Sequence, residues 1–255
     1  MRARFLKQHE ICRKYRFCLK NPDDFILIVV LATFIERIIM FLYLGSGAIN
    51  DSDDIGYIQS GIEFARTGTI TMWSSTPTAM VMPGMPFLTG IISKCFGEGN
   101  LYIDAVRIFW IIFGSATVYV FYKCCCFFTG KWIAVIDSCS FLLLNWAWSD
   151  NTVLTEPPYL FFYMLNFYFM LAMGEQPEGV NRKNAFDYAL SLLAALMFRA
   201  NILVMPAFCA FYLLVIKKKK PVIFFSIYSF WHSRCLFLLS RGASEITGCL
   251  TNLFL

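Results

Sequence analysis

The chain has 255 residues, of which 58% are hydrophobic and 15% are charged, and its mean hydropathy is +0.59. A soluble domain of this length is normally less apolar and richer in charge, so the composition predicts an all-α, polytopic transmembrane helical bundle. Basic residues concentrate in an arm at residues 1–24 and in Lys217–Lys220, beside apolar runs. That distribution is typical of topology signals and argues against a basic groove for nucleic acid.

The first long apolar run, residues 25–44, is long enough to cross the roughly 30 Å of hydrocarbon in a bilayer. Because the basic arm precedes it, we expect a multi-pass protein of the cell (plasma) membrane with a cytosolic N-terminus, and residues 45–80 outside. Glu36 and Arg37 lie within this run. Ionised side chains in a span should face the bundle interior or an interface.

The next stretch opens with Asp51-Ser-Asp-Asp-Ile-Gly-Tyr57. Residues 53–66 carry one apolar stripe on an otherwise polar helix, formed by Ile55, Ile58, Ile62 and Ala65. This pattern predicts an interfacial amphipathic helix in the first outer loop, with Gly68 as its stop.

Residues 81–96 are apolar, but Pro83, Gly84 and Pro86 interrupt their start. We expect either a short span or an interfacial, re-entrant segment here. Stronger apolar segments follow at residues 101–122, 132–149, 157–173 and 186–216.

Two topologies are open, and they differ in whether residues 81–96 cross the membrane. If these residues do not cross, the connections that carry lysine all lie inside, and residues 186–216 form a short outward hairpin with Arg199 near its tip. Asp53 and Glu156 then share the outer side with Arg199. If they do cross, Glu156 lies on the opposite side from Asp53. The charge asymmetry favours the first topology.

Residues 221–255 lack the loop pattern of the earlier segments and follow a run of lysines. Since an A-rich coding stretch can slip frame, we hypothesise that this tail is out of frame or that the gene is truncated. The expected organisation is a cytosolic basic arm at residues 1–24, a membrane domain at residues 25–216 and an uncertain tail at residues 221–255.

Carboxylates supply the sharpest candidate site. The pair Asp53 and Asp54 can act as a general base, hold a divalent metal or orient an acceptor hydroxyl. Alternatively, Ser52 or Asp53 caps the following helix, where acids are favoured in the first turn. Glu156 follows Thr155 at the mouth of an aromatic helix, and a helix start explains the threonine and the prolines there but does not need the glutamate.

Arg107 and Arg199 lie within apolar segments, where arginine is expensive. A planar guanidinium suits the phosphate of a lipid head group, and the alternative is that each side chain snorkels to the interface. Tyr57 and Trp73 can stack on a sugar or belong to the interfacial aromatic belt, with the belt favoured.

The cysteine and histidine residues do not indicate a metal site. The ten cysteines show neither CxxC pairs nor Cys/His ligand spacing, and the two histidines are far from the acidic loop in sequence. A histidine triad or a zinc site is therefore not expected, and no cofactor is certain. A divalent metal at the acidic residues stays open.

Five short motifs occur in order along the chain: Asp53-Asp-Ile-Gly-Tyr57 with Phe64-Ala-Arg-Thr-Gly68, Met82-Pro-Gly-Met-Pro86 with Phe96-Gly97, Val106-Arg-Ile108 with Gly114, Thr155-Glu-Pro157, and Phe198-Arg199 with Pro206. Together they resemble the motifs of lipid-linked-sugar glycosyltransferases of the GT-C superfamily. The nearest subgroup is the family 39-like transferases, which include protein O-mannosyltransferases and the lipid A aminoarabinose transferase. Members are usually much longer, so the resemblance indicates a C-terminally truncated or frameshifted member.

The resemblance implies inverting transfer of a sugar from a polyprenyl-phosphate donor, drawn from the membrane lipid, to an acceptor glycan, lipid or protein. Asp53 would be the general base. The charges inside apolar segments support a competing expectation, a transporter or lipid carrier. The short length compared with the family supports another, an inactive fragment of the transferase. The implied site residues are Asp53, Asp54 and Glu156 as catalytic groups, Arg199 and Arg107 for the donor phosphate, and Tyr57 for the sugar or acceptor.

Overall fold

The computed structural model describes residues 21–73, 76–79, 81–143, 146–175 and 181–217. Within these ranges the regular structure is helical, apart from an isolated β-bridge between Thr71 and Pro77, so the all-α expectation is confirmed for this part of the chain. Residues 1–20 and the tail at 221–255 lie outside it. The elements are α2 (Pro22–Leu44), α3 (Asp53–Thr67), α4 (Gly84–Phe96), α5 (Asn100–Cys125), α6 (Lys131–Ser138), α7 (Ser140–Leu143), α8 (Trp146–Ser149), α9 (Glu156–Gly174), α10 (Arg182–Leu196), the 3₁₀ helix η1 (Ala200–Val204) and α11 (Met205–Lys217).

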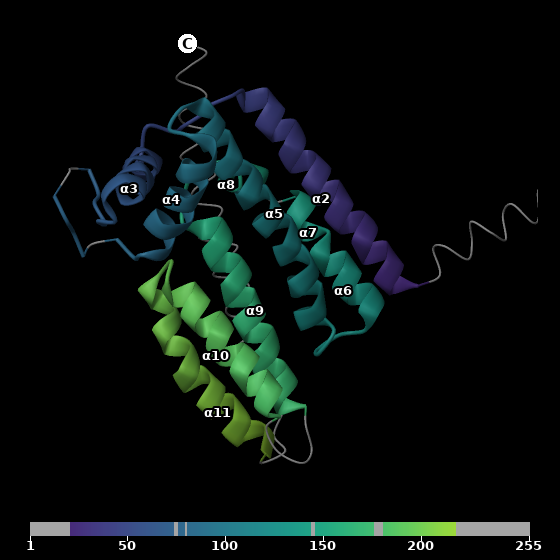
Figure 1. Ribbon diagram of the computed structural model, residues 1–255. Coiled ribbons are helices and arrows are strands. Elements are labelled where there is room, and N and C mark those ends of the chain that lie inside the picture. Colours follow the sequence, from purple (N-terminus) through teal and green to yellow (C-terminus); the bar gives the residue numbers. More distant parts are fainter. Residues whose placement is uncertain (1–20, 74–75, 80, 144–145, 176–180, 218–255) are drawn as a thin grey trace, which may run out of the picture. The chain divides into compact units, whose positions relative to one another are not determined.

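The chain divides into two compact units, Met1–Leu203 and Val204–Leu255. In the first unit, α5 lies beside α2 and α9, and α3 packs on α4 (Figure 1). In the second unit, the described part is essentially the apolar helix α11.

Two of the described helices, α2 and α5, are long and apolar enough to cross a membrane by length and composition. The expected bundle of many spans is not confirmed, because no other described helix meets that standard. The two candidates differ in burial: 22% of the most apolar window of α2 is buried, against 61% for α5. Helix α5 is therefore the central helix of the first unit, and α2 lies at its periphery.

Helix α2 has two distinct faces. Positions spaced three and four residues apart pack inward, and Arg37 is among them, so the expectation that this charge faces the interior is confirmed. Large apolar side chains cover the outward face, as expected of a helix in contact with lipid or a partner. The inward residues are Ile26, Val29, Thr33 and Arg37, and the outward ones include Leu27, Leu31, Ile35, Ile39 and Leu42.

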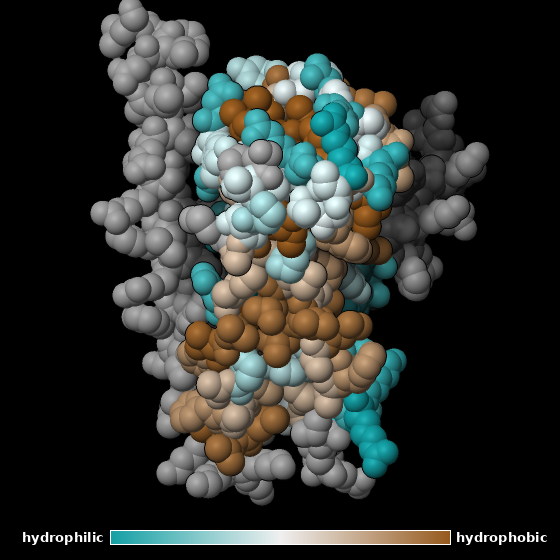
Figure 2. All heavy atoms as spheres, turned by 60° about the vertical axis from the view of Figure 1, so that its left-hand side comes forward, coloured by the Kyte–Doolittle hydropathy of each residue, from teal (hydrophilic) through white to brown (hydrophobic). Residues whose placement is uncertain are grey.

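Helix α3 agrees closely with the sequence expectation, and Gly68 ends it with a left-handed φ of 75°. Its buried face packs tightly on α4. A Cβ at Gly61 would lie 2.4 Å from the Thr89 hydroxyl oxygen, so only glycine permits this approach. On the face drawn in Figure 2, hydrophilic residues gather at the end where α3 lies, and hydrophobic residues predominate below it.

Helix α4 begins at Gly84, directly after Pro83 and with Pro86 in its first turn, and has 13 residues. At 1.5 Å per residue it is about 20 Å long, which is short of the roughly 30 Å of hydrocarbon. This length favours the topology in which residues 81–96 do not cross. Arg199 lies in the break between α10 and η1, which agrees with the expected interruption of residues 186–216.

The expectation that residues 132–149 form one segment is wrong, because they divide among α6, α7 and α8. Helix α6 ends at Ser138, with Cys139 as its C-cap. The ring centroid of Phe141, in α7, lies 5.2 Å from that of Phe121 on α5 and 5.4 Å from that of Trp146 in α8. These ring contacts join the short helices α7 and α8 to each other and to α5.

Candidate functional site

The three acids around the start of α3, Asp51, Asp53 and Asp54, have different environments. Asp51 adopts a left-handed φ of 52°, a turn conformation that aspartate tolerates better than most residues. Asp54 is fully buried, and its carboxylate accepts backbone N–H groups from Asn50 at 2.5 Å, Ser52 at 2.9 Å and Ile55 at 3.1 Å. It therefore fixes the loop that leads into α3.

Asp53, in contrast, is exposed at the first position of α3. Neither Ser52 nor Asp53, the two residues expected to cap α3, has this role. The Ser52 side chain makes no capping hydrogen bond, and the Asp54 carboxylate accepts the backbone N–H groups of Ser52 and Ile55 instead. The acidic pair thus separates into a structural carboxylate and an accessible one. Asp53 is the member of the pair that is free to meet a ligand.

Arg199 joins the start of α9 to the turn after α10. Its Nε donates a hydrogen bond to Oγ1 of Thr155 at 2.7 Å, and another guanidinium nitrogen forms an ion pair with Glu156. The guanidinium carbon also lies 5.9 Å from the ring centroid of Tyr159. The side chains of Arg199 and Glu156 are 37% and 43% exposed, so this pair is open to a ligand.

Tyr57 links this ion pair to the acidic loop. Its pKa is raised, first by burial and then by the negative charges of Asp53 and Glu156, and the Arg199 charge and a hydrogen bond with Thr155 partly offset the rise. Asp53, Glu156, Arg199 and Thr155 are thus the groups whose charge or hydrogen bonding acts on the tyrosine hydroxyl. We call this group, Asp53, Tyr57, Thr155, Glu156 and Arg199, the Tyr57 cluster.

Of the predicted site residues, Glu156 and Arg199 form an ion pair, and both of them and Asp53 act through their charges on a fourth, Tyr57. Sequence reasoning missed the role of Thr155, which it assigned to helix capping. The structure shows no capping hydrogen bond from this side chain, because its hydroxyl binds Arg199 instead. The signal was present in the sequence: a threonine directly before a glutamate at the entrance of an apolar helix.

Gly84 holds the backbone that carries Arg199. Its N–H donates to the carbonyl oxygen of Met197 at 2.7 Å, and a Cβ at Gly84 would lie 2.5 Å from that oxygen. The ring of Phe198 stacks on Phe162 of α9, with centroids 6.0 Å apart. The start of α4 and the aromatic face of α9 therefore fix the turn from which the arginine extends.

Arg107 lies apart from the Tyr57 cluster and is fully buried. Its guanidinium donates to the carbonyl oxygens of Gly45 at 2.7 Å and Asn151 at 3.0 Å and pairs with Asp104 at 3.2 Å, and it covers the Phe41 ring at 4.4 Å. A lipid phosphate would have to displace these partners. The geometry thus gives Arg107 a structural role, joining α5 to the loops after α2 and α8.

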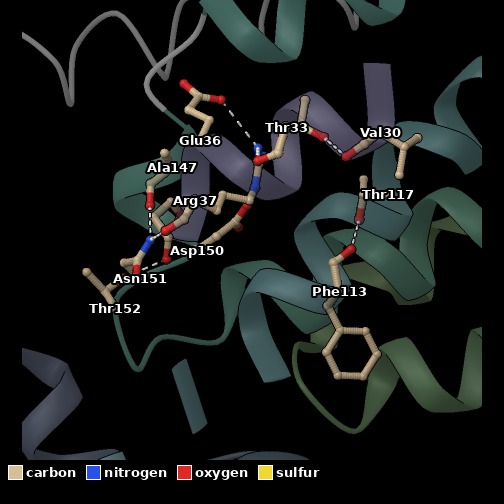
Figure 3. Close-up of polar contacts among 11 residues, drawn as sticks. Val30, Thr33, Glu36, Arg37, Phe113, Thr117, Ala147, Asp150, Asn151 and Thr152 are labelled. Atoms are coloured by element: carbon tan, nitrogen blue, oxygen red, sulfur yellow. Dashed lines mark hydrogen bonds and ion pairs between the residues drawn. The ribbon is translucent and has the colours of Figure 1, made fainter. Parts of the chain in front are cut away.

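A second buried polar centre surrounds Arg37, as Figure 3 shows. Its Nε pairs with Asp150 at 2.6 Å, and a second guanidinium nitrogen lies 3.6 Å from Glu36. The Asn151 amide donates to the Arg37 carbonyl oxygen at 3.1 Å and to that of Ala147 at 2.7 Å. The sequence indicated a buried arginine here, but it did not identify Asp150 as the partner.

A small hollow, lined by charged and apolar side chains, adjoins the Arg37–Asp150 pair. Gly114 makes room for the Asp150 side chain, because a Cβ at this position would lie only 1.9 Å from a carboxylate oxygen of Asp150. The indole nitrogen of Trp146 is buried and has no hydrogen-bond partner among the described residues. The lining residues are Arg37, Gly114, Thr117, Phe141, Trp146, Asp150, Pro157 and Leu160.

The described residues contain no group of three or more His, Cys, Asp or Glu side chains placed to hold a metal ion. The Tyr57 cluster contains two carboxylates and one guanidinium, so its net charge is negative. An anionic ligand would add a further negative charge to this site. A cation arriving together with such a ligand would balance these charges.

Fold and site together define a helical protein with two helices able to cross a membrane and an accessible carboxylate–guanidinium cluster where α3, α9 and the end of α10 meet. Comparison of the chain with protein-family models, curated proteins and solved structures finds no match. The function is therefore argued from the cluster alone.

Proposed function

We propose that the chain is a membrane glycosyltransferase, which moves a sugar from a polyprenyl-phosphate donor to an acceptor on the outer face of a cell membrane, with inversion. The observation that carries the proposal is the Tyr57 cluster. It combines an exposed carboxylate, Asp53, with a half-exposed guanidinium, Arg199, around one tyrosine. Sugar transfer from a lipid phosphate needs a base for the acceptor and a positive charge for the leaving group.

The chemistry assigns one role to each side of the cluster. Asp53 accepts the proton of the acceptor hydroxyl while that oxygen bonds to the anomeric carbon. The bond from this carbon to the phosphate oxygen breaks, and the phosphate leaves with the bonding electron pair. Arg199 offsets the charge that develops on this phosphate. Attack and departure on opposite faces of the carbon invert its configuration.

Glu156 and Thr155 position the guanidinium before the donor arrives. Both hold Arg199 by hydrogen bonds from its planar fork, so the arginine does not need to be ordered when the phosphate binds. The hydroxyl of Tyr57, which responds to the charges of both Asp53 and Arg199, can bind the acceptor or the sugar. Asp54 supports the loop and takes no part in proton transfer.

The amphipathic character of the donor supports a place at the membrane surface. A polyprenyl tail remains in lipid while its phosphate-linked sugar reaches water. In the proposed topology α2 crosses from the cytosol, α3 lies along the outer interface, and the cluster faces the outer leaflet. The donor then enters sideways from the bilayer, and the acceptor enters from water.

Turnover of labelled donor is the direct test. The full chain in lipid nanodiscs would receive a radiolabelled, short-chain polyprenyl-phosphate mannose together with candidate acceptors, and new labelled product would be separated by extraction. Asp53→Asn should reduce turnover by about 10²-fold or more, the effect expected of losing a general base. Asp51→Asn is the matched control, because asparagine also tolerates the left-handed turn and Asp51 lies outside the cluster. Equal turnover in both variants refutes the assignment.

The buried pair Arg37–Asp150 and the adjoining hollow favour a second candidate, a transporter or lipid carrier. Ionisable groups within membrane helices commonly mark substrate or ion pathways. The two candidates separate in the same assay: a carrier binds the labelled lipid and returns it unchanged, whereas a transferase converts it.

A further inference from the structure

Trp73 is the largest exposed aromatic residue that the structure places beside the Tyr57 cluster. Its side chain is 56% exposed, and its backbone φ is +59°. A bulky residue rarely adopts this left-handed conformation, because its side chain crowds the backbone, and the conformation persists only where the surroundings impose it.

The loop that carries Trp73 is fastened at its base. The N–H of Thr78 donates to the carbonyl oxygen of Ile70 at 2.9 Å, and Thr71 forms a β-bridge with Pro77. Thr71 is also buried, at 2% exposure. The base is therefore part of the folded unit, and it imposes the strained conformation on the tryptophan.

The indole ring lies against the first turn of α3. A Cβ added to Gly56 would be 3.1 Å from an indole ring carbon, so the glycine permits close contact. Gly56 and Tyr57 follow Asp53 by three and four residues, and residues at these spacings share one face of a helix. The exposed indole thus borders the face that carries the proposed base.

Membrane anchoring alone does not explain this arrangement. An interfacial tryptophan needs only an exposed position at the right depth, and the aromatic belt needs no strained backbone and no contact with a catalytic face. A sugar ring, by contrast, needs a flat apolar surface at a fixed distance from the base, because one face of the ring presents mainly C–H groups.

We propose that Trp73 is the platform on which the donor's sugar ring stacks, so that its anomeric carbon lies within reach of an acceptor bound at Asp53. This inference rests on the proposed function. It assigns sugar recognition to the loop before α4 and phosphate recognition to Arg199. Trp73 is accordingly a positioning residue and does not exchange protons.

Two probes separate the assignments: a short-chain polyprenyl phosphate, and the same lipid carrying mannose. Binding of each to the full chain in nanodiscs is measured by scintillation proximity. Trp73→Ala should weaken binding of the mannosyl lipid about tenfold, as expected for loss of one aromatic stacking contact, and leave binding of the sugar-free lipid unchanged. Trp73→Phe should restore most of the difference, and Arg199→Ala should weaken both lipids.

Two controls exclude indirect effects. Trp132→Ala removes a tryptophan of similar exposure, 46%, which contacts Phe25 at the far end of α2 and should change neither affinity. Trp73→Gly removes the ring and the backbone strain together, so it should unfold within a few degrees of the unchanged protein yet lose the preference for the mannosyl lipid.

The outcomes separate this inference from the proposed function. If the unchanged protein binds both lipids but Trp73→Ala weakens both equally or neither, the platform is wrong and the transferase proposal survives. Equal weakening indicates a membrane anchor. If the unchanged protein binds neither lipid, both proposals are wrong.

Discussion

The buried pair between Arg37 and Asp150 allows a quantitative prediction for the fold. The two side chains are 1% and 5% exposed, and their atoms lie 2.6 Å apart. Replacing Asp150 with asparagine keeps the shape but removes the nearer charge partner of a buried guanidinium, whose other partner, Glu36, lies 3.6 Å away. Breaking a buried pair in this way costs about 3–5 kcal/mol.

For a chain of this size, 1 kcal/mol corresponds to about 2–4 °C in melting temperature, so Asp150→Asn should lower it by roughly 6–20 °C. The double variant Arg37→Met, Asp150→Leu removes both charges and should recover most of the loss, because apolar replacement of a buried pair is often neutral. Thermal unfolding in detergent, followed by the reactivity of buried cysteines, measures each value.

An exposed ion pair in the same protein supplies the matched control. Arg66 and Glu98 form a pair whose side chains are 59% and 43% exposed. Glu98→Gln should therefore change the melting temperature little, because solvent screens an exposed pair. The reasoning fails if Asp150→Asn and Glu98→Gln lower the melting temperature by similar amounts. It also fails if the loss of stability in the double variant equals the sum of the losses in Arg37→Met and Asp150→Leu alone.

Three further predictions concern the site. The methyl group added by Gly84→Ala should press against the Met197 carbonyl, which costs about 1–3 kcal/mol of stability, as overpacking does. The resulting displacement of Arg199 should also lower turnover. An unchanged melting temperature together with unchanged turnover would contradict this prediction. Arg107→Lys should destabilise the protein strongly yet leave lipid-phosphate affinity unchanged at a temperature where the variant is folded, and binding assays decide between this and a direct phosphate contact. The pKa of Tyr57 is raised in the folded protein, so this tyrosine ionises at a lower pH in the unfolded chain, and the free energy of unfolding falls above about pH 10. Tyr57→Phe should show a smaller fall above pH 10. A pH profile identical to that of the unchanged protein argues against the cluster.

Local patterns in the sequence predicted helix α3 and the break at Arg199 well. Residues 53–66 carry an apolar stripe and end before a glycine, and these two signals depend only on neighbours along the helix. The break at Arg199 was also visible, because the apolar segment around it is too long for one short helix and too short for two full crossings.

Features that depend on contacts distant in sequence were not predictable in the same way. The separation of Asp53 from Asp54 depends on which carboxylate meets the backbone of Asn50. The partner of Arg37 lies 113 positions away, and no periodic pattern points to it. Likewise, Arg107 and Arg199 look alike in sequence, and only the structure shows that one is enclosed and the other half-exposed.

The central claim is that Asp53 and Glu156 share one water-facing site outside the membrane. A chain depleted of its native cysteines, with single cysteines at position 53 or 156 and at position 23 as an opposite-end control, can be labelled in intact cells by a membrane-impermeant maleimide. We expect labelling at positions 53 and 156 from outside, and at position 23 only after the membrane is opened. Labelling of position 53 from outside and of position 156 only after opening would contradict the account.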